Sequence, residues 1–256
     1  MNDIELANAV DASYWDSLRL MAGACGGDVL ERDGVLAIAS GAPVASLNVA
    51  FVTRELPNPK AALAQAADFF DARRLSFVVR VREGTDPESE QAATSMGMPY
   101  SDTIPGMALH PIPIAPPAID LEIRTVEDIE TLSLFRGVLA AGFGMPLSIA
   151  EKLVTPGWLA QEAFELYVGF VDGVAAATST LVPTPPTAGV YNVATLDRFR
   201  RRGIGLAMTW HCLSRGMALG CHLGALQASS MGRPVYERMG FRTVAPYRTF
   251  RRSDEE

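Results

Sequence analysis

The chain has 256 residues, of which 48% are hydrophobic and 20% charged, and its formal net charge is −7. This is typical of a globular protein with one large domain or two smaller ones. The acidic charge argues against a nucleic-acid-binding protein, and no apolar run reaches the roughly 18 residues that a membrane span needs. The N-terminus lacks the charge-then-apolar pattern of a secretory signal. We therefore expect a cytoplasmic protein without a nucleic-acid or membrane partner.

The cysteines give no sign of a metal site. Cys25, Cys212 and Cys221 are odd in number and lack the spacing of metal ligands. Small buried thiols are the simpler interpretation. No metal is expected.

The first half begins with a helix and then turns to strands. Apolar spacing predicts helices at residues 3–21, 61–70 and 88–96, and β-forming runs predict strands at 35–40, 44–52, 75–81 and 107–110. The proline-rich stretch 110–118 predicts an extended linker, because proline disfavours both helix and interior strand. We therefore expect a module at residues 1–109, the linker at 110–118, and a second domain at 119–256.

The second half carries the more informative pattern. It begins with a predicted strand at residues 120–125, two helices that start near 129 and 147, and a strand hairpin at 166–181. Residues 190–194 then form an apolar run that predicts a buried strand. Arg200-Arg201-Arg202-Gly203-Ile204-Gly205 follows, and helical spacing resumes from Leu206.

This order of strand, basic glycine loop and helix suits an anion. The first turn of a helix has N–H groups without partners and a partial positive charge. Glycines let an anion approach the backbone closely, and arginines add forked donors. A Walker loop would need Lys-Ser/Thr after Gly205, and a dinucleotide fingerprint would need a glycine at the position of Met208. Neither motif fits.

Arg200-x-x-Gly203-x-Gly205 after an apolar strand resembles the acyl-CoA pyrophosphate loop of GNAT-superfamily N-acetyltransferases. Downstream, residues 222–229 resemble the next strand of that family, Tyr236 to Phe241 resembles its Tyr-x-x-x-Gly-Phe signature, and 242–251 resembles a closing hairpin. The resemblance implies an α/β (α+β) GNAT fold with a mixed, mostly antiparallel central sheet flanked by helices.

The order of elements in the first half is similar to that in the second, which implies a tandem with a degenerate GNAT-like N-terminal module. An unrelated α+β domain is the alternative. Pro57 and Pro59 stand where the phosphate loop would be, and they supply no amide donors. The first half is therefore not expected to hold CoA.

The resemblance also assigns site residues. It implies that the backbone of β-strand residues meets the pantetheine arm of acetyl-CoA and that the loop and the first helical turn cradle its pyrophosphate. Ser229 stands where many members have an asparagine that touches CoA, and it is equally a helix N-cap. The implied cofactor-binding residues are Val193, Ala194, Thr195, Arg200, Arg201, Arg202, Gly203, Ile204, Gly205, Leu206, Ala207 and Ser229.

Tyr236 is the implied catalytic acid, because a phenol near the sulfur can protonate the leaving thiolate. An ordinary half-buried tyrosine is the alternative. For the general base, Glu162, Glu165, Tyr191 and Asn192 all stay open.

These features predict an acetyl-CoA-dependent N-acetyltransferase in which a primary amine attacks the thioester directly. The alternatives are a catalytically silent CoA-binding sensor or scaffold, and an O- or S-acyl acceptor. The acceptor is open among small amines, antibiotics, amino acids and peptide or protein amines. For the first half, closure over the acceptor cleft and homodimer formation both stay open.

Overall fold

The computed structural model describes residues 1–114 and 121–252, so the C-terminal part of the predicted linker lies outside the described residues. The chain forms two compact units. Unit 1 consists of Met1–Ser17 and Gly106–Val244, and unit 2 consists of Leu18–Pro105 and Ala245–Glu256. The division of the sequence at residues 109 and 119 stays a prediction. The contacts within the structure divide the chain differently. Unit 1 is mostly the second half of the chain but includes the N-terminal segment, and unit 2 is mostly the first half but includes the C-terminal segment.

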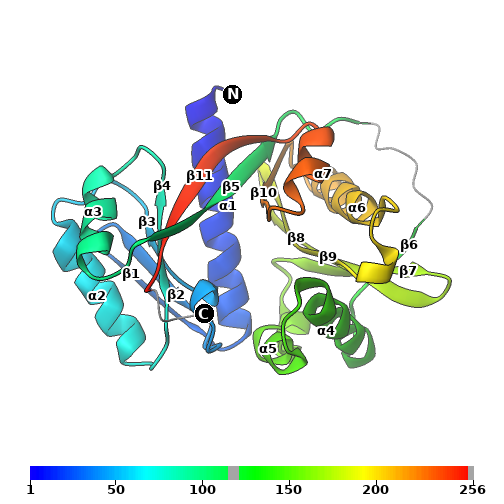
Figure 1. The fold of residues 1–256 in the computed structure, drawn as a ribbon. Helices are drawn as coiled ribbons and strands as arrows, with labels where there is room; N and C mark the ends of the chain where they lie inside the picture. The colour runs from blue at the N-terminus through cyan, green and yellow to red at the C-terminus, as the bar shows by residue number, and fades with distance from the viewer. Residues whose placement is uncertain (115–120, 253–256) are drawn as a thin grey trace. The chain divides into compact units, whose positions relative to one another are not determined.

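Unit 1 is built on a mixed sheet with the strand order β5-β10-β9-β8-β7-β6 (Figure 1). Only β9 and β10 pair in parallel, whereas the other neighbours pair antiparallel. The strands are β5 (Tyr100–Leu109, in unit 1 from Gly106), β6 (Glu122–Thr125), β7 (Glu165–Val171), β8 (Val174–Thr184), β9 (Thr187–Thr195) and β10 (Leu223–Gln227). The helices are α4 (Ile129–Phe143), α5 (Leu147–Leu153), α6 (Ile204–Ala218) and α7 (Arg233–Arg238), with short 3₁₀ turns at Pro156–Ala160 and Asp197–Phe199.

Helices α4 and α6 pack on opposite faces of β8 and β9 (Figure 1). The alternation of side chains along β9 explains this arrangement, because successive residues of a strand point to opposite faces. A Cβ at Gly205 of α6 would lie 3.7 Å from Thr195 Oγ1 and 4.0 Å from Val193 Cγ1, whereas a Cβ at Gly142 of α4 would lie 2.8 Å from Ala194 Cβ. The end of β9 is therefore held between two helices.

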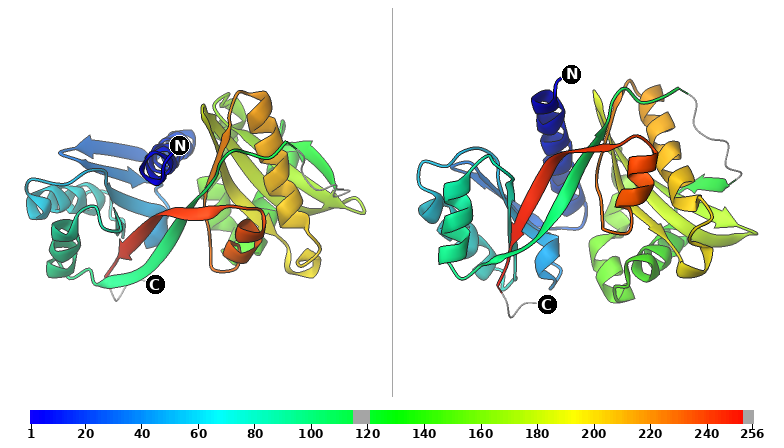
Figure 2. Two further views of the ribbon diagram at one scale, coloured as in Figure 1. Left: turned by 90° about the horizontal axis from the view of Figure 1, so that it is seen from above. Right: turned by 45° about the horizontal axis from the view of Figure 1, so that its top comes forward.

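Unit 2 is built on strands in the order β1-β2-β3-β4-β11. Its strands are β1 (Asp28–Arg32), β2 (Val35–Ala39), β3 (Asn48–Val52), β4 (Val78–Arg82) and the part of β11 (Arg242–Phe250) from Ala245 onward. Helices α2 (Pro59–Asp71) and α3 (Pro87–Ser95) pack on these strands (Figure 2), and a 3₁₀ turn at Ala45–Leu47 precedes β3. Phe70, Phe77 and Phe250 lie in its apolar core.

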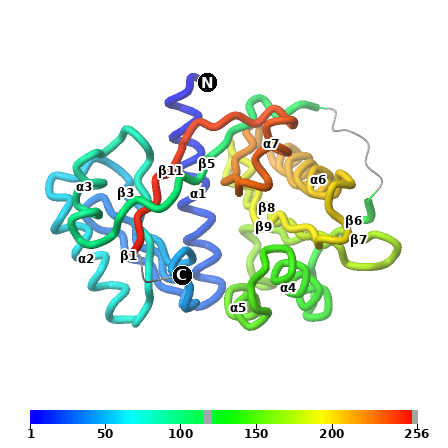
Figure 3. Tube along the Cα trace, viewed as in Figure 1, coloured from blue at the N-terminus to red at the C-terminus, as the bar shows by residue number. Residues whose placement is uncertain are grey.

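Three elements pass from one unit into the other. Helix α1 (Asp3–Ala24) belongs to unit 1 up to Ser17, β5 enters unit 1 at Gly106, and β11 enters unit 2 at Ala245. Figure 3 follows the C-terminal segment from α7 through β11. In unit 2, β11 pairs antiparallel with β4, from Tyr247 opposite Arg82 to Phe250 opposite Val79.

The structure corrects three details of the predicted elements. Residues 242–251 do not form a hairpin, because β11 is a single strand. The strand predicted at 44–52 begins only at Asn48, after the 3₁₀ turn. Strand β1 was not predicted, because its charged ends and exposed residues hide it from an apolar pattern. Among the described residues, no helix combines the length and apolarity that crossing a membrane requires.

Candidate functional site

A pocket of about 670 Å³ in unit 1 gathers most of the predicted site residues. Its walls come from the C-terminal end of α4, the end of β9, the loop before α6, the first turn of α6, and α7 with the segment before it. All of the predicted residues line this pocket except Arg202 and Ala207. Residues from separate parts of the sequence therefore share one cavity, although their binding roles stay predictions.

The parallel strands β9 and β10 separate beside the pocket. Their pairing runs only from Thr187 opposite Leu223 to Gly189 opposite Ala225, whereas β9 continues to Thr195 and β10 to Gln227. The two strands therefore splay apart beyond Gly189. The splay leaves the backbone of β9 beyond Gly189 without a partner on the β10 side.

A bulge in β9 lies at the start of this separation. The register between β8 and β9 shifts between Thr178 and Thr180, where Tyr191 and Ala194 are the facing residues. Asn192 has a left-handed φ of 52°. It donates from Nδ2 to Thr180 Oγ1 at 3.1 Å and accepts at its carbonyl from Thr178 Oγ1 at 2.8 Å. A bulge bends and twists its strand, so these two bonds fix the direction in which β9 leaves the ladder.

The N-terminus of α6 presents backbone amides to the pocket. Gly203, the N-cap, has a left-handed φ of 79°, which favours glycine. The first helical bond runs from Ala207 N to Gly203 O at 3.0 Å. The amides of Ile204, Gly205 and Leu206 precede that bond and have no acceptor one turn earlier. Together with the helix dipole, they suit an anionic group in the cavity.

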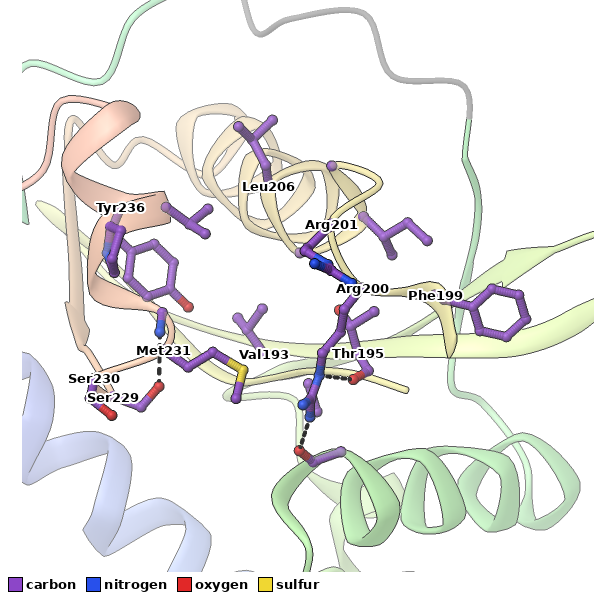
Figure 4. A pocket seen from close by; sticks show the side chains of 18 of the residues that line it. Val193, Thr195, Phe199, Arg200, Arg201, Leu206, Ser229, Ser230, Met231 and Tyr236 are labelled. Atoms are coloured by element: carbon purple, nitrogen blue, oxygen red, sulfur yellow. Dashed lines mark hydrogen bonds between the residues drawn. The ribbon is translucent and has the colours of Figure 1, made fainter. Parts of the chain in front are cut away.

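The three loop arginines play different parts. Arg200 donates from Nε to Thr195 O at 3.1 Å and from Nη2 to Gly142 O at 2.8 Å (Figure 4), and its Nη1 lies 2.8 Å from Asp197 Oδ1. It therefore ties the loop to β9 and to the last turn of α4. Arg201 lines the pocket. Arg202 lies outside the pocket lining, with its guanidinium 5.7 Å from the centre of the Phe199 ring.

Tyr236 lies on α7 with only 9% of its surface exposed, and its hydroxyl points into the cavity (Figure 4). Burial raises the pKa of Tyr236 to about 12, and a hydrogen bond with Thr209 opposes that rise. The hydroxyl therefore keeps its proton throughout the neutral pH range. A protonated phenol in a cavity can donate to a developing anion.

Ser229 is engaged by its own segment and still lines the pocket. Its Oγ accepts from Gly232 N at 3.1 Å, and its carbonyl accepts from Arg233 N at 2.9 Å. The helix N-cap role considered from the sequence is therefore wrong, because the N-cap of α7 is Gly232, and Ser229 instead closes the turn before the helix. The hydroxyl proton is not used by the bond from Gly232, because there the oxygen is the acceptor.

None of the four candidates for the general base lines the pocket. Burial raises the pKa of Glu165, but hydrogen bonds from Arg215 and Tyr167 outweigh burial, and the net direction is downward. Tyr191 donates to Ser13 O at 3.1 Å, and burial raises its pKa to about 12. Glu165 and Tyr191 are therefore held by structural partners.

Several lining residues did not emerge as site residues from the sequence. Met231 is 64% exposed, and its side chain extends into the cavity (Figure 4). Phe199 lies beside the loop, and Arg238 is the basic residue in the last turn of α7. No spacing rule marks them, because they reach the pocket only through the packing of α7 and the turn before α6. Within residues 1–114 and 121–252, no group of three or more His, Cys, Asp or Glu side chains could hold a metal ion.

Comparison with known proteins relates part of the chain to a known family. Residues 136–241 match the model described as the Acetyltransferase (GNAT) family. No curated protein sequence matches the chain. Among solved structures, the chain is similar to a GCN5-related N-acetyltransferase from Kribbella flavida, with a TM-score of 0.72 and 17% identity over 97% of this chain and 96% of that chain.

Two further structures support the same fold. A GCN5-related N-acetyltransferase from Sphaerobacter thermophilus has a TM-score of 0.58 and 17% identity over 88% of this chain and 75% of that chain. A tandem GNAT protein from the clavulanic acid biosynthesis pathway has a TM-score of 0.56 and 17% identity over 84% of this chain and 77% of that chain. At such identities the likeness shows the fold, and it extends to the N-terminal module. The predicted tandem GNAT fold is confirmed, and residues 136–241 match the model of the GNAT acetyltransferase family.

Proposed function

We propose that the protein transfers an acetyl group from acetyl-CoA to a primary amine. The amine nitrogen attacks the thioester carbonyl carbon, and the carbon–sulfur bond then breaks. The departing thiolate takes the proton of Tyr236, the amine nitrogen gives up a proton to solvent, and the Tyr236 phenolate regains a proton from solvent. The products are an N-acetyl amide and CoA, without a covalent enzyme intermediate.

One observation carries the proposal. A single pocket joins the splayed end of β9, the free amides at the N-terminus of α6 and the hydroxyl of Tyr236. A CoA thioester has a phosphate end that suits the amides, an amide-bearing arm that suits a free strand edge, and a sulfur that needs a proton. We propose that the N–H of Val193, beside the bulge, polarises the thioester carbonyl, as an oxyanion donor does.

Within its described residues, unit 2 lacks the splayed strand pair and presents fewer free amides at a helix N-terminus. Its parallel pair β3 and β4 stays paired from Val49 opposite Val78 to Val52 opposite Val81, so that β3 ends without a splay. Helix α2 begins at Pro59, which has no N–H, and its N-cap Asn58 accepts from the Ala61 amide at 3.2 Å. We therefore propose that unit 2 does not bind CoA and that each chain holds one acetyl-CoA.

Calorimetric titration with acetyl-CoA tests the proposal. We expect one site per chain in the wild type and its loss in Gly205→Asp, because the carboxylate competes with the pyrophosphate for the amides. An acidic residue in the first turn stabilises a helix, so this variant is expected to fold. Gly205→Ala is the matched control, since the added Cβ makes only ordinary contacts, at 3.7 Å or more. Two sites, or no binding by the wild type, would contradict the proposal.

A CoA-binding sensor without turnover is the second candidate. It is favoured by the observation that no candidate base lines the pocket. Release of CoA in the presence of a library of amines separates the two, because a sensor binds acetyl-CoA without releasing CoA. The acceptor within the class of primary amines and the formation of a homodimer stay open, and the cytoplasmic location stays a prediction.

A further inference from the structure

Most arginines near the pocket are already engaged. The guanidinium groups of Arg198 and Arg202 lie 4.9 and 5.7 Å from the centre of the Phe199 ring. On α7, Arg233 donates from Nε to Glu237 Oε1 at 2.7 Å. The first arginine of the loop is held by the three contacts described above. None of these four side chains is free to meet a ligand without giving up a contact.

Arg201 and Arg238 differ from these four. Both line the pocket, and neither has an ion pair, hydrogen bond or ring contact within the part of the chain that the structure describes. They come from different elements, since Arg201 lies in the loop before α6 and Arg238 lies in the last turn of α7. No aspartate or glutamate is among the pocket-lining residues. The cavity therefore offers two free cationic groups, on separate walls, to an anionic ligand.

Two cationic groups on separate walls suit a ligand with two separate anionic groups, as the proposed cosubstrate has. CoA carries a pyrophosphate and, across the ribose, a separate 3′-phosphate. Arg201 adjoins the free amides of α6 and so belongs with the pyrophosphate. We propose that Arg238 binds the 3′-phosphate and that it makes the protein prefer 3′-phosphorylated acyl-CoA over donors that lack this group. This inference rests on the proposed function, because it assumes that the pocket binds CoA.

The physical basis is the charge of a phosphate monoester. It carries close to two negative charges at neutral pH and has oxygens that match the forked donors of arginine. Because Arg238 is exposed, water and salt weaken the pairing, and its contribution is that of a surface ion pair. We therefore expect a selectivity of about fivefold at low ionic strength, and a smaller one as salt is added.

Titration of the full chain with CoA and with 3′-dephospho-CoA at low salt tests the assignment. The wild type is expected to bind CoA about fivefold more tightly. Arg238→Gln should bind CoA as weakly as the wild type binds 3′-dephospho-CoA, with unchanged affinity for the latter. Arg201→Gln should lower the affinity for CoA and for 3′-dephospho-CoA by the same factor. Arg233→Gln is the matched control, because it removes an equal charge from α7 outside the pocket, and it should keep the wild-type preference.

The outcomes separate the two proposals. Equal affinity of the wild type for both ligands, or an Arg238→Gln variant that loses affinity for both equally, overturns the role of Arg238 and leaves the proposed function in place. Binding of neither ligand by the wild type overturns both. Arg238→Lys guards against a folding defect, since it keeps the charge and should retain part of the preference. Circular dichroism of each variant verifies the fold.

Discussion

The burial of Tyr236 suits its hydroxyl to donate a proton. An exposed tyrosine is half ionised near pH 10, whereas burial raises the pKa of Tyr236 to about 12. The acid form is therefore fully populated at neutral pH, and it remains so through mildly alkaline pH. Ionisation of Tyr236 should therefore not lower the rate of acetyl transfer as the pH rises past 10, because its hydroxyl still carries its proton there.

Tyr236→Phe tests the role of that proton. We expect the turnover number to fall by about 100-fold, since general acid catalysis contributes about that much, while the dissociation constant of acetyl-CoA changes less than about twofold. Steady-state release of CoA and calorimetric titration measure the two quantities. Tyr167→Phe is the control, because it removes a hydroxyl in unit 1 that bonds to Glu165 and lies outside the pocket. Equal losses of turnover and of affinity would make Tyr236 a binding residue.

At the scale of elements, the side chain of Arg200 links the loop before α6 to β9 and to α4. Its guanidinium reaches the Gly142 carbonyl in the last turn of α4, where the helix dipole favours a cation, and the Thr195 carbonyl at the end of β9. Gly142 itself lies close against β9, because a Cβ there would be 2.8 Å from Ala194 Cβ. The loop, the strand and the helix that form three walls of the pocket are thus joined by one side chain.

This role could not be read from the sequence. The pattern of strand, glycine loop and helix is local, and so it predicted β9, the loop and α6 correctly. The partner of Arg200 at Gly142 is 58 residues away, and no local pattern contains that contact. For the same reason the sequence grouped the three arginines together, although the structure gives them three different surroundings.

Substitution of Arg200 should therefore affect stability. Arg200→Gln leaves the Gly142 and Thr195 carbonyls without their charged donor, and we expect a loss of about 1–3 kcal/mol in the free energy of unfolding. Arg200→Lys should restore little, because one ammonium cannot reproduce the forked geometry. Urea denaturation measures the change. Arg202→Gln is the control, with an expected change within about 0.5 kcal/mol. A similar loss of unfolding free energy in Arg200→Gln and Arg202→Gln would mean that the contacts of Arg200 with α4 and β9 do not stabilise the fold.

At the scale of the whole molecule, each unit combines a long segment from one half of the chain with a short segment from the end of the other half. The order of elements in the sequence was enough to predict a tandem of related modules, because each module repeats the same local patterns. It was not enough to predict that β11 would complete the sheet of unit 2 beside β4. Pairing between distant strands depends on packing across the whole chain, and an apolar run of residues fits several possible neighbours. The predicted closing hairpin failed for this reason.

The C-terminal segment passes from unit 1 to unit 2 within β11, and this leads to a prediction about two phenylalanines near that point. Phe241 and Phe250 lie close in sequence and are almost fully buried, at 3% and 2% exposed, but Phe241 belongs to the core of unit 1 and Phe250 to the core of unit 2. Substitution of either by leucine should cost about 1–3 kcal/mol, because each leaves part of a packed core unfilled. The cost should fall on different units.

Hydrogen exchange of backbone amides, read along the chain, measures where each variant is weakened. Phe250→Leu should speed exchange in β2, β3 and β4, which lie far from it in the sequence, and should leave β8 and β9 and the affinity for acetyl-CoA near their wild-type values. Phe241→Leu should speed exchange in β8 and β9, lower the affinity for acetyl-CoA, and leave β2, β3 and β4 near their wild-type values. The reason is that Phe241 belongs to the same core cluster as residues of β8, β9 and α6. If Phe250→Leu instead weakened β8 and β9, then β11 would belong with the C-terminal half, as the order of the sequence suggests.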